Sequence, residues 1–144
     1  MPATAGYSGT PLPKKLGIKP DSTLALIDAP ADFEATLGPL DEVAVRHDAR
    51  GRWDLLILFV TRRAALARRL PGLVRRLDGR SFWIAWPKRT SGVHTDITED
   101  VLREVALPLG VVDYKVCAID ATWSGLKFAR RAMRDERRGK APRG

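Results

Sequence analysis

The chain has 144 residues, of which 44% are hydrophobic and 29% are charged. This length and composition are typical of one globular domain with its own core, and they exclude the disordered and fibrous classes. The longest apolar run, 55–60, has six residues, whereas a membrane-spanning helix needs about 20. We therefore expect a soluble protein with no membrane partner.

The formal net charge of +8 is concentrated at the end of the sequence. Residues 130–144 hold seven Lys or Arg against Asp135 and Glu136, a net charge of +5, which leaves +3 for residues 1–129. This distribution predicts a single domain over 1–129 followed by a basic, mobile tail over 130–144. An alternative role for the tail is electrostatic attachment to nucleic acid.

The one cysteine, Cys117, lies in an apolar strand pattern and cannot form an internal disulfide. The first twenty residues lack the apolar run of a signal peptide. Together these features predict a cytoplasmic location and an inert, buried thiol.

The first half of the chain alternates between strand and helix patterns after a lead-in rich in Gly, Ser and Pro. Residues 23–27 predict a buried strand, 32–37 a short helix that Gly38 ends, and 43–45 a second, brief strand. Residues 53–60 are almost all apolar, which is typical of a parallel strand covered on both faces.

The next pattern predicts a helix that Thr61 caps and Gly79 ends. Apolar residues recur at helical spacing, and the arginines between them form a solvated face. Pro71 is expected to kink or interrupt this helix, because it has no N–H and its ring crowds the preceding turn. The helical residues that we expect to be buried are Leu66, Leu70, Leu73, Val74 and Leu77.

The second half continues with a strand over 81–86 and a polar loop over 87–97. Thr98 is a favoured N-cap, so a helix is expected from there to Gly110. Residues 111–119 predict a strand, and 126–129 are expected to return antiparallel at the edge of the sheet. This order of elements predicts an α/β fold, a small Rossmann-like three-layer sandwich with a mostly parallel sheet and a C-terminal antiparallel hairpin strand.

Right-handed crossovers would bring the carboxyl ends of the parallel strands to one edge, where such sheets bind ligands. At this edge the loop after residue 86 joins two cations to hydroxyl groups, which suits a phosphate or carboxylate. We expect Lys88, Arg89 and Ser91 to contact an anion, Trp123 to form an apolar wall, and Asp28 to orient the ligand. The same loop residues also fit a plain solvated surface.

Features of cofactor and metal sites are weak in this sequence. The loop 28–32 after the first strand has no glycine and includes Pro30, so we expect no cofactor bound in the standard way. Asp48 lies about 20 residues further on, where a ribose-binding acid would sit. His94 and Asp96 share a loop and fit either an acid–base pair or separate surface residues. The two histidines and one cysteine have no metal-ligand spacing, so no metal is expected.

Several stretches resemble a known family. They are 5–12, 14–19, Trp86-Pro87-Lys88 with Ser91-Gly92-Val93, Asp96 with Thr98-Glu99-Asp100, and 123–127. In these segments the chain, from Ala5 to about Arg130, resembles the uncharacterised bacterial family named domain of unknown function 3052. The resemblance implies a small bacterial protein and supplies no catalytic residues. More remotely, the order of elements is similar to a trimmed class I methyltransferase core.

The residues favour a protein that binds a small anionic or nucleotide-like ligand at the carboxyl edge of its sheet, without demonstrated catalysis. Two alternatives stay open, a degenerate S-adenosylmethionine-dependent methyltransferase and a basic protein associated with nucleic acid. A regulatory protein that binds a partner through its tail is a further alternative.

Overall fold

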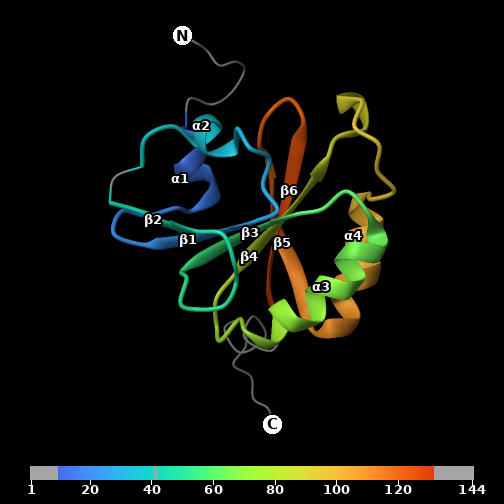
Figure 1. The fold of residues 1–144 in the computed structure, drawn as a ribbon. Coiled ribbons are helices and arrows are strands. Elements are labelled where there is room, and N and C mark those ends of the chain that lie inside the picture. The colour runs from blue at the N-terminus through green and yellow to red at the C-terminus, as the bar shows by residue number, and fades with distance from the viewer. Residues whose placement is uncertain (1–9, 41, 132–144) are drawn as a thin grey trace.

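A computed structural model describes residues 10–40 and 42–131 of the chain. Its centre is one six-stranded sheet with the strand order β2-β1-β3-β4-β6-β5 (Figure 1). The strands are β1 (Thr23–Ile27), β2 (Ala44–Arg46), β3 (Leu55–Phe59), β4 (Phe82–Pro87), β5 (Val111–Ala118) and β6 (Trp123–Arg130).

The pairing within this sheet is mostly parallel. β1 runs parallel to β2 and β3, and β3 runs parallel to β4. β6 is antiparallel to both of its neighbours, β4 and β5. The predicted α/β class, with a mostly parallel sheet and an antiparallel C-terminal hairpin, is therefore confirmed.

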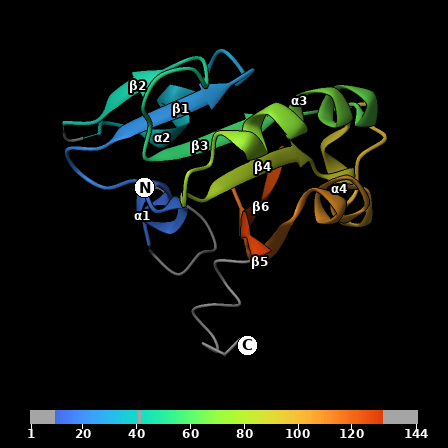
Figure 2. The same ribbon diagram turned by 90° about the horizontal axis from the view of Figure 1, so that it is seen from below.

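Helices cover both faces of the sheet and complete three layers (Figures 1 and 2). The short helices α1 and α2 lie on one face, and the longer α3 and α4 lie on the other. The α-helices are α1 (Leu12–Leu16), α2 (Phe33–Leu37), α3 (Arg63–Arg75) and α4 (Glu99–Ala106), and the 3-10 turns are η1 (Arg89–Ser91) and η2 (Leu107–Leu109).

Each face of the sheet has its own hydrophobic core. Leu66 and Leu70 of α3 are fully buried against Leu56 and other strand residues on one face. Full burial of such a side chain is worth about 1.5–3 kcal/mol. On the opposite face Trp83 is fully buried, and its Nε1 donates a hydrogen bond of 2.8 Å to the carbonyl of Leu16. The indole thus fixes α1 against the sheet without an unsatisfied polar atom.

The expectation that the last strand lies at the sheet edge is wrong. β6 is inserted between β4 and β5, and β5 forms the edge. The burial of the two strands gives the physical reason: Leu126 and Phe128 of β6 are buried, whereas Lys115 and Val116 of β5 are exposed. A strand with neighbours on both sides favours the more apolar sequence, and the strand with polar residues takes the edge.

Helix α3 differs from its prediction at both ends, and of the two expectations for Pro71, a kink or an interruption, the interruption does not occur. It begins at Arg63 rather than directly after Thr61, it ends at Arg75 rather than near Gly79, and it runs without interruption through Pro71. The proline removes one backbone hydrogen bond, at a cost of about 3 kcal/mol. Burial of the apolar face of α3 on the sheet offsets this cost. Helix α4 has the predicted N-cap, because Oγ1 of Thr98 accepts a hydrogen bond from Val101 N at 3.2 Å.

The start of the predicted tail is tied to the domain. The Arg130 guanidinium donates to the Val74 carbonyl at 2.6 Å, and Arg131 N donates to the Gly110 carbonyl at 2.7 Å. Residues 132–144, which hold the rest of that tail, lie outside the described residues. In the described ranges no helix has both the length and the apolar character that crossing a membrane requires.

Candidate functional site

The carboxyl ends of the parallel strands define one rim of the sheet, which we call the carboxyl rim. Ile27, Leu58 and Ile84 lie in one row across β1, β3 and β4. Asp28 directly follows β1 and Lys88 directly follows β4, so both residues are at this rim. Strand spacing and rise place their backbones roughly 14 Å apart, about 10 Å across the sheet and about 10 Å along it.

Two segments distant in sequence are joined at the β4 end of the rim. Lys88 N donates a hydrogen bond of 2.7 Å to the carbonyl of Thr122, in the turn between β5 and β6. Pro87 pairs with Trp123 across β4 and β6. Oδ1 of Asp120 accepts the N–H groups of Thr122 and Trp123, each at 2.8 Å, and so fixes the turn. Figure 1 shows this turn and the loop after β4 at the same end of the molecule.

The anion-binding residues that we expected from the sequence surround this junction. Lys88 is partly exposed and Arg89 is exposed, and within 10–40 and 42–131 neither of them forms an ion pair with a carboxylate. Ser91 Oγ accepts Val93 N at 3.1 Å, which leaves its hydroxyl hydrogen for another acceptor. Gly92, directly after η1, has φ +84°, a left-handed backbone conformation that favours glycine.

Trp123 ends a series of aromatic contacts across the rim. The rings of Phe33 and Phe59 meet edge to face with centroids 4.8 Å apart, and those of Phe59 and Trp123 meet in the same way at 5.1 Å. Phe33 and Phe59 are buried, whereas Trp123 is partly exposed. The indole is therefore held in place by Phe59, and part of it is accessible to solvent.

Asp28 is separated from the other four candidate residues. Its backbone has φ +61°, and its carboxylate pairs with the Arg69 guanidinium of α3 at 3.1 Å. Arg69 also lines an apolar hollow of about 200 Å³ between the end of β1 and α3, with Ile27, Leu58 and Leu73. Both partners of the ion pair are about half exposed, so the pair contributes roughly 0–1 kcal/mol to stability. Asp28 thus belongs with α3, whereas Lys88, Arg89, Ser91 and Trp123 lie where β4 ends and β6 begins.

The other acids that the sequence singled out hold loops in place. Oδ1 of Asp48 accepts the Arg46 guanidinium at 3.1 Å and Arg50 N at 3.0 Å, and these hydrogen bonds hold the pKa of that carboxyl below its usual value. Asp96 Oδ1 accepts Arg63 N at 2.7 Å and so caps α3 from a distant loop. The predicted cap residue Thr61 contributes only its carbonyl, which accepts the Thr95 hydroxyl at 2.7 Å.

Phe33, Phe59 and Arg69 were not expected at the rim from the sequence. Phe59 closes an apolar strand and Phe33 opens a short helix, so both have the pattern of ordinary core residues. Their position at the end of a strand or the start of a helix at the rim was the available signal. Arg69 is one of six arginines on α3 and its neighbours, and no local pattern distinguishes it.

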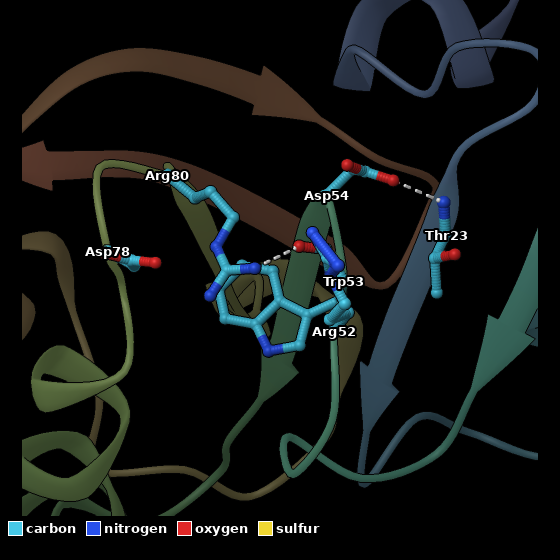
Figure 3. A pocket seen from close by; sticks show the side chains of 6 residues that line it. All are labelled: Thr23, Arg52, Trp53, Asp54, Asp78 and Arg80. Carbon is cyan, nitrogen blue, oxygen red and sulfur yellow. Dashed lines mark hydrogen bonds between the residues drawn. The ribbon is translucent and has the colours of Figure 1, made fainter.

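A second hollow, of about 460 Å³, lies at the opposite end of the sheet (Figure 3). The Arg80 guanidinium lies 4.3 Å from the centre of the Trp53 ring and donates to the carbonyls of Trp53, Arg76 and Leu77. Asp54 accepts Thr23 N at 2.7 Å. The donors of Arg80 are thus used to hold the end of α3 against the start of β3, which indicates a structural role for this hollow.

No family model and no curated protein matches the chain. Solved structures share its fold. An S-adenosylmethionine-dependent methyltransferase from Aquifex aeolicus is similar with a TM-score of 0.56 and 11% identity, over 80% of this chain and 85% of the other. A protein of the NADB-Rossmann superfamily from Streptococcus agalactiae is similar with a TM-score of 0.53 and 11% identity, over 88% of this chain and 69% of the other.

The magnesium protoporphyrin IX methyltransferase from Synechocystis PCC 6803, solved with bound S-adenosylmethionine, is similar with a TM-score of 0.51 and 9% identity, over 83% of this chain and 74% of the other. The fold is therefore Rossmann-like and resembles that of methyltransferases. At these identities the similarity concerns the fold alone, since one fold supports many functions.

Proposed function

We propose that the protein binds a small anionic, nucleotide-like molecule at the carboxyl rim, between the loop after β4 and the turn before β6. The observation that carries this proposal is the partly exposed Trp123 indole, held against Phe59 and placed beside Lys88. A planar ring stacked on an aromatic side chain gains about 1–3 kcal/mol. Lys88 and Arg89 supply positive charge for the anionic part of the same molecule.

Thermal shift and calorimetry with AMP, ADP and ATP test this function. A nucleotide at about 100 times its dissociation constant should stabilise the wild-type chain by about 2.7 kcal/mol. Lys88→Ala removes a charge-assisted hydrogen bond and should weaken binding by about 10- to 100-fold.

The matched control for this test is Arg68→Ala, which removes an exposed cation from α3. The control variant should bind the nucleotides as the wild type does. The proposal fails if none of the three nucleotides stabilises the chain, or if both variants lose affinity to the same degree.

The fold of the neighbours favours S-adenosylmethionine as a second candidate ligand. The loop after β1 fits such a cofactor poorly. It has no glycine, Pro30 offers no N–H, and the carboxylate of Asp28 is paired with Arg69. Calorimetry with about millimolar S-adenosylmethionine separates the candidates, because the absence of heat at that concentration removes methyl transfer from consideration.

A further inference from the structure

Two lysines from neighbouring strands, Lys115 and Lys127, meet at the last turn of α1, and we call them the lysine face. Lys115 and Lys127 are direct partners across β5 and β6. Lys115 Nζ donates to the carbonyl of Lys15 at 3.1 Å. Lys127 Nζ lies 3.1 Å from the point that a Cβ on Gly17 would occupy. The two ammonium groups therefore both end beside α1.

In residues 10–40 and 42–131 no carboxylate lies within ion-pair distance of the two lysines of this face. Like charges directly opposite on neighbouring strands destabilise a sheet. In the ion pairs among the described residues the cation is Arg46, Arg63, Arg69, Arg103 or His47. The Lys15 carbonyl compensates part of the Lys115 charge, and the Trp83 ring, whose centre lies 5.7 Å from Lys127 Nζ, compensates part of the other. Neither contact supplies a negative charge, so a bound anion would still lower the repulsion between the two ammonium groups.

The positive charge continues from the lysine face to the carboxyl rim. Lys88 N donates to the carbonyl of Thr122 at 2.7 Å, so Lys88 lies beside Trp123 at the rim. Burial raises the pKa of the Cys117 thiol between these cations, and the charges of Lys15, Lys115 and Lys88 oppose that rise. Trp123 lies four positions before Lys127 on β6, about 13 Å away. A line of cations thus leads from α1 to a partly exposed indole.

We propose that the lysine face binds the phosphates of a single-stranded nucleic acid. Lysines suit this partner because they act as mobile point charges along a backbone, and single strands combine such a track with bases stacked on aromatic side chains. A duplex keeps its bases stacked on one another inside the helix, so its bases cannot stack on Trp123 and this contact adds no affinity. One base of the strand lies on Trp123, and in that contact the inference rests on the proposed nucleotide site.

Fluorescence anisotropy of the full chain with a labelled oligouridylate of about 15 nucleotides tests the contact. Lys115→Gln combined with Lys127→Gln should reduce the salt dependence of log Kd by about 1.4, because each phosphate contact on a single strand contributes about 0.7 to the slope. Arg68→Gln combined with Arg75→Gln removes the same charge from exposed positions of α3. This matched control should leave the slope unchanged.

Stability without nucleic acid supplies a second readout. Glutamine retains a donor for the Lys15 carbonyl but removes the repulsion, so the lysine double variant should melt about 1–3 °C higher than the wild type. If the lysines serve only to cap α1, their removal should lower the melting temperature. A lower melting temperature together with unchanged affinity would overturn the inference.

Three other outcomes also overturn the inference. They are equal losses of affinity in both double variants, equal affinity for a polyglutamate peptide, and equal affinity for a duplex. Titration with AMP separates the two proposals. If AMP binds through Lys88 but the lysine double variant binds the oligonucleotide as the wild type does, the mononucleotide site stands and nucleic-acid binding by the lysine face is wrong. If the oligonucleotide binds through the lysine face and AMP does not bind, only the mononucleotide site fails.

Discussion

Asp96 stabilises the amino end of α3 from a loop 33 residues further along the chain. The residue at the N-cap position, Arg62, offers no side-chain acceptor to the helix. Asp96→Ala would leave the Arg63 N–H without this partner and remove a negative charge from the positive end of the helix dipole. We expect a loss of about 1 kcal/mol in the free energy of unfolding, measured by urea denaturation.

Asp96→Asn is the appropriate comparison, because its amide oxygen still accepts the hydrogen bond. This variant should lose less stability than Asp96→Ala. Equal stability of Asp96→Ala and the wild type would show that the cap contributes nothing.

Single residues also show how far the candidate site follows from sequence. Lys88 and Trp123 were predictable as rim residues because each lies at a strand end, and strand ends were visible as changes from apolar to polar residues. The orientation of Asp28 was not predictable from sequence, because it depends on a φ of +61° and on an ion pair with Arg69, which lies 41 positions later. The contact between Asp96 and α3 is equally remote in sequence, and local spacing carries no signal of either.

Pro71 is the position at which α3 departs most from its intrinsic preferences. The helix runs through it, so the carbonyl of Ala67 lacks the N–H that any other residue would supply. Pro71→Ala restores that hydrogen bond but also gives the unfolded chain more freedom, which costs about 0.4–1 kcal/mol. We expect a net stabilisation of about 2 kcal/mol, measured as a higher melting temperature.

Ala67→Gly at the neighbouring turn provides a contrast, because it should destabilise the same helix by about 1 kcal/mol. A lower melting temperature for Pro71→Ala would show that the proline ring contributes packing that outweighs the missing hydrogen bond.

At the scale of elements, local sequence patterns predicted whether a segment is a helix or a strand better than they predicted where a strand lies in the sheet. The strand Thr23–Ile27 has the predicted bounds, and α4 has the predicted cap at Thr98. Both depend on neighbouring residues alone. The order β4-β6-β5 depends on which of two strands buries more apolar surface between partners, a comparison between segments that no single window of sequence contains.

The two faces of the whole molecule are covered unequally. One face packs against α3, with 13 residues, and α4, with eight. The other packs against α1 and α2, with five residues each. Helices of one to two turns have little stability of their own and depend on tertiary contacts. For α1 these contacts include the hydrogen bonds from Trp83 and Lys115 to its last carbonyls.

This asymmetry predicts a gradient of local stability, which hydrogen exchange under native conditions can measure. Amides of α1 and α2 should exchange through local opening, with protection well below that of the central strands β1, β3 and β4, whose amides should exchange only on global unfolding. The reason is that opening a five-residue helix exposes a few side chains, whereas freeing a central strand exposes both cores. Nucleic acid bound to the lysine face should raise the protection of α1 selectively, because the Lys115 ammonium donates to the Lys15 carbonyl of that helix. Uniform protection across the two faces would contradict the gradient, and an equal increase in α3 would contradict the selective effect.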